Sequence, residues 1–93
     1  YRFVDALAQA AMTLGAEPEH AQRLALATVE GASALAAGAD VSPGALADRV
    51  ASPGGMTREG LNVLDDEGAL VALLTATLDA TAKRGAELSR GDG

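Results

Sequence analysis

Ala69-Leu70-Val71-Ala72-Leu73-Leu74 is apolar at every position and belongs to the most apolar stretch of the chain, residues 69–78. Alanine and leucine have high helix propensity, and β-branched residues do not alternate with polar ones, so we expect a helix over residues 67–89. A helix that is apolar all round is buried on several sides. A chain of 93 residues can hardly cover it, so we expect a second subunit to do so in a closed twofold dimer.

Two helices are expected at the start of the chain, each bounded by glycine or proline. The first runs from the start to Leu14, and Gly15 is well placed to end it in a left-handed conformation. Glu17-Pro18-Glu19 opens the second, because proline suits the first helical turn and acidic residues suit the positive end of the helix dipole. Gly38 is expected to stop this second helix.

Two shorter helices are expected on either side of a glycine-rich loop. Ser42 and Pro43 are suited to cap and open a helix over residues 43–50. The next helix is expected to start at residue 56 or 57, to end near residue 65 and to present Leu61 and Leu64 inward.

The acidic run of residues 65–67 is interpreted as the junction between the last two helices. Asp65 or Asp66 would cap the final helix there, which is a simpler reading than a metal site or an acid–base site. The sequence as a whole therefore predicts an all-α fold of about five helices.

Charge and composition exclude several classes of function. The net charge is −6 and the basic residues are scattered, which argues against a nucleic-acid partner and against an anionic membrane surface. The chain has no cysteine, so disulfides, thiol catalysis and cysteine-bound metal are excluded. The lone His20 cannot form a histidine-rich metal site, and residues 69–78 are shorter than the roughly 20 residues that a membrane-spanning helix needs.

The start of the chain indicates part of a longer protein. It begins at Tyr1 rather than at methionine, and no basic region is followed by an apolar segment and a cleavage site. We therefore expect no secretory signal peptide, and the lack of cysteine is compatible with a reducing compartment.

Ser52-Pro53-Gly54-Gly55-Met56-Thr57 is the segment with the clearest chemistry. Its two glycines permit unusual backbone angles and leave no Cβ in the way of a ligand. The helix that follows begins with N–H groups that lack an internal partner, at the positive end of its dipole, which makes an anion site. Thr57 adds a hydroxyl that can cap the helix or contact a ligand. Arg58 adds positive charge near the loop, or it is simply a solvated surface residue. On spacing alone, a plain turn between two helices is the more common interpretation.

The loop and its flanks resemble the C-terminal dimerisation domain of pyrroline-5-carboxylate reductases. That family carries Ser-Pro-Gly-Gly, then a small residue or threonine, then threonine and a short helix, matched here by residues 52–57 with Gly60-Leu61 and Val63-Leu64. Upstream, Leu46-Ala47-Asp48-Arg49-Val50 and Thr28-Val29-Glu30-Gly31-Ala32 match two further family segments. The resemblance covers essentially the whole chain, residues 1–93.

The resemblance implies a fold, a partner and a cofactor. The fold is that of the helical C-terminal domain of 6-phosphogluconate dehydrogenase, intertwined with a second copy in a homodimer, and relatives assemble into rings of dimers. In the family, an N-terminal Rossmann domain binds NADPH or NADH. This chain has no Gly-x-Gly-x-x-Gly loop after a strand, so alone it should neither bind nucleotide nor catalyse. The implied parent is a cytoplasmic enzyme of proline biosynthesis.

The resemblance also implies roles within the loop. Backbone N–H groups of Gly55, Met56 and Thr57 would hold the carboxylate of 1-pyrroline-5-carboxylate, beside Gly54 and with help from the Ser52 hydroxyl. The Thr57 hydroxyl would face the ring nitrogen, which makes Thr57 the candidate catalytic residue. Hydride from the nicotinamide would then reduce the C=N bond to give L-proline, with no metal involved.

Two positions depart from the family pattern. Met56 stands where relatives usually have threonine or alanine, which leaves its backbone N–H in place but makes the pocket wall bulkier and more apolar. Asp40 stands where relatives often have glutamate, and we interpret it as a solvated loop residue.

Two other functions remain open at this point. The chain could be the helical dimerisation domain of a related dehydrogenase, which a parent active on another carboxylate would favour. It could instead be a helical interaction module with no ligand, in which case replacing Thr57 by alanine would change neither ligand binding nor parent activity.

Overall fold

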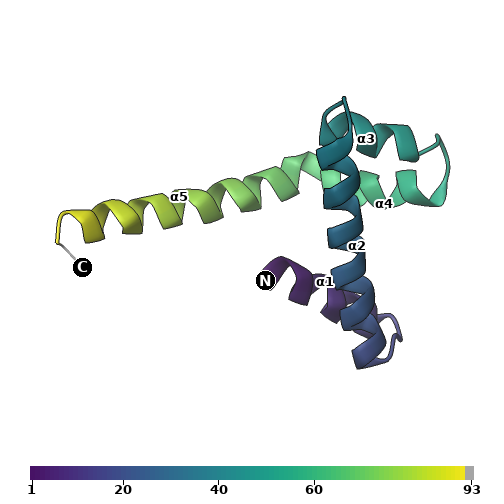
Figure 1. The fold of residues 1–93 in the computed structure, drawn as a ribbon, viewed down its shortest axis with the longest axis horizontal. Coiled ribbons are helices and arrows are strands. Elements are labelled where there is room, and N and C mark those ends of the chain that lie inside the picture. Colours follow the sequence, from purple (N-terminus) through teal and green to yellow (C-terminus); the bar gives the residue numbers. More distant parts are fainter. Residues whose placement is uncertain (92–93) are drawn as a thin grey trace. The chain divides into compact units, whose positions relative to one another are not determined.

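The structure is a computed structural model that describes residues 1–91, so residues 92–93 of the predicted 1–93 domain lie outside the described part. The described residues form helices and turns with no strand, which confirms the all-α prediction (Figure 1). The elements are α1 (Arg2–Thr13), α2 (Pro18–Gly38), α3 (Pro43–Val50), α4 (Met56–Asp65), the short 3₁₀ helix η1 (Asp66–Gly68) and α5 (Ala69–Ser89). The chain divides into two compact units, Tyr1–Leu46 and Ala47–Gly93.

Unit 1 is built on the packing of α1 against α2 through small side chains. Its buried core consists of Ala8, Ala21 and Ala25, which are at most 3% exposed. Three partly buried residues pack around this core: Val4, Ala11 and Ala16. Alanine at the contact lets the two helix backbones approach closely, but it leaves little apolar area buried.

Gly15 ends α1 as its position predicted. Its φ is +110°, a conformation that side chains with a Cβ resist. The Gly15 N–H donates to the Met12 carbonyl and the Ala16 N–H donates to the Ala11 carbonyl, both at 3.0 Å. This pair of bonds is a Schellman motif, which satisfies carbonyls that the end of the helix would otherwise leave unpaired.

Both ends of α2 and the start of α3 lie at or within one residue of the positions predicted from the sequence. Pro18 is the first residue of α2, but Gly38 is its last residue rather than the position after it, and Ala39 leaves the helix in an extended conformation. Ser42 caps α3 as expected, since its Oγ accepts a hydrogen bond from the Ala45 N–H at 3.2 Å. Asp40, as expected, is an exposed residue in the connection between α2 and α3.

The start of α5 differs from the prediction. We expected the last helix from residue 67 with Asp65 or Asp66 as its cap, whereas η1 intervenes and α5 begins at Ala69. Glu67 and Gly68 both adopt left-handed angles, with φ of 54° and 66°, so the chain kinks after the two aspartates. Gly68 is therefore the residue that precedes α5, and no side chain caps the helix there.

The leucines of α4 are less covered than predicted. Leu61 is half-buried, but the side chain of Leu64 is 49% exposed. The prediction that both face inward is therefore wrong for Leu64 within a single chain, because unit 2 contains too few neighbouring side chains to enclose it. Ala51 is the one residue of unit 2 that is buried among those described.

No residue of α5 is buried in the single chain. Val71, Leu73 and Leu78 are each at least 66% exposed. The hydroxyls of Thr75, Thr77 and Thr81 donate to the carbonyls four residues earlier. These threonines therefore satisfy their own donors, so they add little unmet polarity to the surface of α5.

Among the described residues, no single helix is long and apolar enough to cross a bilayer. Pro18–Gly38 and Pro43–Val50 meet the length and composition test only when they are taken together, as a bent pair.

Candidate functional site

The loop between α3 and α4 begins with a tight turn over residues 52–55. The Ser52 carbonyl accepts a hydrogen bond from the Gly55 N–H at 3.0 Å. Pro53 occupies the second position of the turn, and Gly54 occupies the third with a φ of +74°. Proline followed by a residue with positive φ is the pattern of a type II turn, which explains why this sequence turns the chain here.

Gly55 is the residue that precedes α4 and opens it. Its φ and ψ of −82° and 167° are extended, while its carbonyl accepts the first helical hydrogen bond, from the Glu59 N–H at 3.1 Å. No side chain caps this helix start. The N–H groups of Met56 and Thr57 therefore lie at the positive end of the α4 dipole without a partner inside the helix, which is the arrangement that binds anions.

The turn brings Ser52 against Gly55. A Cβ added to Gly55 would lie 2.6 Å from the Ser52 Oγ and 3.2 Å from the Ser52 carbonyl oxygen. The hydroxyl therefore occupies the space that a side chain at residue 55 would need, and it lies beside the start of α4. A side chain at residue 55 would require the Ser52 hydroxyl to rotate away and the Ser52 carbonyl to shift slightly, so this loop geometry favours glycine.

The five predicted site residues thus lie on one short segment and are largely open to solvent. Ser52, Gly54 and Thr57 are exposed, Gly55 is half-buried and Met56 is 93% exposed. The Gly55 N–H is engaged in the turn, and the first helical donor is the Glu59 N–H, so the N–H groups that remain open at this helix start are those of Met56, Thr57 and Arg58. The prediction that these residues bind a substrate carboxylate stays a prediction.

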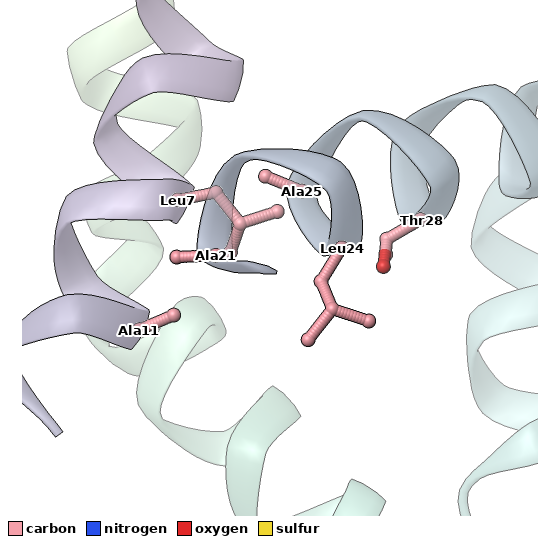
Figure 2. Close-up of a pocket in the computed structure, with 6 residues that line it drawn as sticks. All are labelled: Leu7, Ala11, Ala21, Leu24, Ala25 and Thr28. Atoms are coloured by element: carbon pink, nitrogen blue, oxygen red, sulfur yellow. The ribbon is translucent and has the colours of Figure 1, made fainter. Parts of the chain in front are cut away.

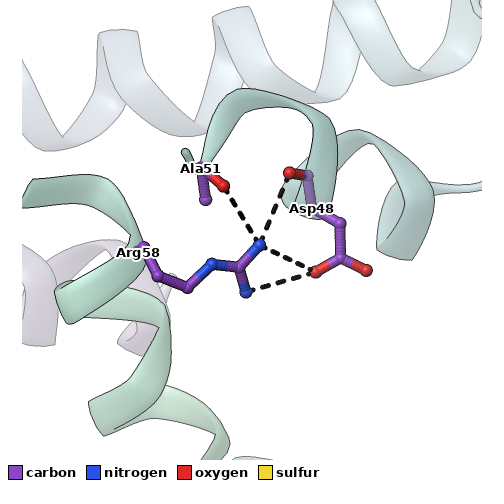
Figure 3. A network of polar contacts seen from close by, with 3 residues as sticks. All are labelled: Asp48, Ala51 and Arg58. Atoms are coloured by element: carbon purple, nitrogen blue, oxygen red, sulfur yellow. Dashed lines mark hydrogen bonds and ion pairs between the residues drawn. The ribbon is translucent and has the colours of Figure 1, made fainter. Parts of the chain in front are cut away.

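The contacts of Arg58 were not predicted from the sequence, where this residue indicated only a nearby positive charge. Figure 3 shows its guanidinium between the end of α3 and the start of α4. Both terminal nitrogens lie 3.3–3.4 Å from the Asp48 Oδ1. One of them also donates to the carbonyls of Asp48 and Ala51, at 3.4 and 3.2 Å. Asp48 and Arg58 are ten residues apart, so no spacing rule within one helix could have paired them.

A second candidate is a hollow in unit 1 between α1 and α2 (Figure 2). It has a volume of about 160 Å³ and is lined by Leu7, Ala11, Ala21, Leu24, Ala25 and Thr28. Thr28 brings the only polar side chain of this lining. A binding site for a small polar molecule needs several converging polar groups, so the loop before α4 is the better candidate.

The close approach of Ser52 to Gly55 predicts the outcome of a substitution. Gly55→Ala should lower the free energy of unfolding by about 1–2 kcal/mol, because the new methyl group overpacks the turn. In a Ser52→Ala background the cost should fall, because the nearest atom is gone. Urea unfolding at one fixed protein concentration measures both effects.

Gly60→Ala is the matched control. A Cβ at this position in α4 meets nothing within 4 Å, so the change should stabilise the helix by about 0.5–1 kcal/mol. If Gly55→Ala were as well tolerated as Gly60→Ala, the described packing of Ser52 against residue 55 would be wrong.

The family model and the relatives that match this chain point to the same protein family. The family model described as pyrroline-5-carboxylate reductase dimerisation matches residues 1–88. Pyrroline-5-carboxylate reductase 2 of Bacillus subtilis (strain 168) is 35% identical over 88 residues, which are 95% of this chain and 31% of that protein. No solved structure gave a significant match.

Two further relatives carry the same name. The pyrroline-5-carboxylate reductase of Aquifex aeolicus (strain VF5) is 43% identical over 68 residues, which are 73% of this chain and 26% of that protein. The reductase of Pisum sativum is 39% identical over 89 residues, which are 96% of this chain and 32% of that protein. The chain therefore spans about a third or less of the length of the curated relatives that it matches.

Proposed function

Because the chain belongs to the pyrroline-5-carboxylate reductase dimerisation family, we propose that it is the dimerisation and substrate-binding domain of a longer oxidoreductase. That enzyme reduces 1-pyrroline-5-carboxylate to L-proline, and this chain is its C-terminal helical part. The observation that carries the assignment of a site is the uncapped start of α4 behind the turn of residues 52–55.

In this proposal the start of α4 binds the carboxylate of the substrate. The backbone N–H groups of Met56 and Thr57 supply the donors, and the helix dipole adds a favourable field for an anion. Gly54 allows the turn through its positive φ. Gly55 leaves room for the substrate because it has no side chain, whereas its N–H is not a free donor because it is bonded to the Ser52 carbonyl. The Ser52 hydroxyl, beside Gly55, gives one further polar contact.

Thr57 is the proposed catalytic residue. Its side chain lies in the first turn of α4 and is exposed, so its hydroxyl can reach a molecule whose carboxylate rests on the helix start. Hydride adds to the carbon of the C=N bond, and the ring nitrogen carries a proton taken up from water, so that a secondary amine results. A hydroxyl beside the ring nitrogen orients that nitrogen and can share a hydrogen bond with it. The reaction then requires little acid–base chemistry from other residues of this chain.

The reductant in this proposal is NADPH or NADH, bound outside this chain. Residues 1–91 contain no strand, so they cannot form the strand, glycine loop and helix that hold a dinucleotide in a Rossmann fold. The chain itself binds and orients the substrate. We place the enzyme in the cytoplasm, in keeping with a biosynthetic reductase.

The proposed partner is a second copy of the chain. The matched family is described by its dimerisation, and no residue of α5 is buried in a single subunit. A homodimer whose subunits cover each other's α5 would bury this surface, and such dimers could assemble further into rings.

The experiment uses the full-length protein that contains this chain, with reduced nicotinamide absorbance as the readout. We expect oxidation of NADPH or NADH in the presence of 1-pyrroline-5-carboxylate, formation of L-proline, and no turnover by the isolated chain. Activity on another carboxylate alone would indicate a related dehydrogenase. No activity on any carboxylate, together with indifference to changes at Thr57, would indicate an interaction module.

A further inference from the structure

We propose that Arg58 is a positioning residue for the carboxylate-binding loop, acting through Asp48 and the Ala51 carbonyl. This inference rests on the proposed function of the loop. It assigns to Arg58 a role that differs from direct contact with the substrate: the guanidinium fixes the end of α3 to the start of α4, and thereby fixes where the N–H groups of Met56 and Thr57 point.

The contacts of Arg58 join two points that border the loop on either side. Arg58 lies in the first turn of α4, and its partners are Asp48 near the end of α3 and Ala51 just after it. Only residues 52–55 separate Ala51 from α4. A planar guanidinium with several donors can hold a carboxylate oxygen and two carbonyls at once, which a single ammonium group cannot do with the same geometry.

The hydrogen bond from Arg58 to the Ala51 carbonyl is more buried than the ion pair between Arg58 and Asp48. Ala51 is 3% exposed, and the side chain of Arg58 is 27% exposed, whereas that of Asp48 is 74% exposed. A backbone carbonyl removed from water needs a donor, and Arg58 supplies one at 3.2 Å. The loop thus starts from a residue that is both packed and hydrogen-bonded.

The charge of Arg58 is already paired with the Asp48 carboxylate. This pairing makes it possible to distinguish a role in positioning the loop from direct binding of the substrate. Its two terminal nitrogens converge on the Asp48 carboxylate at 3.3–3.4 Å. A substrate carboxylate that bound Arg58 directly would compete with Asp48. If Arg58 instead acts through Asp48, removal of Asp48 weakens substrate binding rather than strengthening it.

The test compares full-length variants in steady-state kinetics with 1-pyrroline-5-carboxylate. Arg58→Ala should raise the KM for the substrate about tenfold, because the loop loses its defined position, and should leave the KM for the nicotinamide cofactor unchanged. Arg58→Lys should restore part of the loss, because lysine keeps the charge but not the fork of donors. Asp48→Ala should raise the substrate KM by a smaller factor, because the bond to Ala51 remains.

Arg2→Ala is the matched control, since Arg2 forms an exposed pair with Asp5 in α1 at 3.2 Å and should change neither KM. An unchanged substrate KM in Arg58→Ala, or a lower one in Asp48→Ala, would overturn the positioning role. Thr57→Ala in the same assay distinguishes a failure of the proposed function of the loop from a failure of the positioning role of Arg58. If it also has no effect, the proposed function of the loop fails, and if it alone impairs turnover, only the role of Arg58 fails.

Discussion

Leu73→Glu in α5 is expected to convert the proposed dimer of this chain into monomers. Leu73 is 66% exposed in a single subunit and stands in the part of α5 that is apolar on every side. In the proposed dimer each subunit buries this leucine, and the variant would both lose that burial and place a charge in an apolar contact. We expect a loss of at least about 3 kcal/mol, or more than a hundredfold in the dimer dissociation constant.

The matched control for this prediction lies in the charged half of the same helix. Lys83→Ala removes an exposed ion pair with Asp79, whose N–O distance is 2.9 Å. Such pairs contribute about 0–1 kcal/mol, so the control should remain dimeric. Sedimentation velocity at several concentrations measures both variants. If Leu73→Glu kept the association of the parent chain, this part of α5 would have to lie outside the subunit interface.

Thr57→Ala is expected to lower kcat/KM of the full-length enzyme by about 5- to 150-fold, or about 1–3 kcal/mol. The reason is the loss of one hydrogen bond to a substrate group that becomes buried in the complex. Thr57→Ser is the control, because it keeps the hydroxyl and should retain most of the activity. Equal kinetics for the alanine and threonine enzymes would remove Thr57 from the site and leave only the backbone of the loop.

Local features of the fold could be predicted from the sequence because short stretches of chain determine them. Gly15 and Ser42 act within a few residues of their own positions, as a helix end and a helix cap, and both do what their residue types favour. The turn of residues 52–55 follows in the same way from proline and glycine in adjacent positions.

Other features depend on contacts or conformations that a local pattern does not specify. The pairing of Arg58 with Asp48 joins two helices, and either residue alone looks like an ordinary surface charge. The start of α5 was misplaced because Glu67 adopts a left-handed φ of 54°, which is uncommon for a residue other than glycine. A cap at Asp65 or Asp66 is plausible by residue type, but the kink separates these residues from the helix.

The exposure of α5 is the feature of the structure that leads to the same dimer prediction as the sequence. The sequence contains more apolar helix surface than one short chain can enclose, and the buried residues among positions 1–91 are all small: Ala8, Ala21, Ala25 and Ala51. A core made of alanine contributes little hydrophobic stabilisation, which supports the proposal that a second copy of the chain supplies further apolar contact.

The mass of this chain in solution, determined by light scattering over a dilution series, is the measurement that decides whether α5 is covered by a second copy. We expect the mass of a dimer, and we expect it to persist as the chain is diluted, because two copies cover each other's α5. A folded monomer of 9.2 kDa at all concentrations would contradict the dimer proposal, since α5 would then be stable while exposed and no second copy would be needed to cover it.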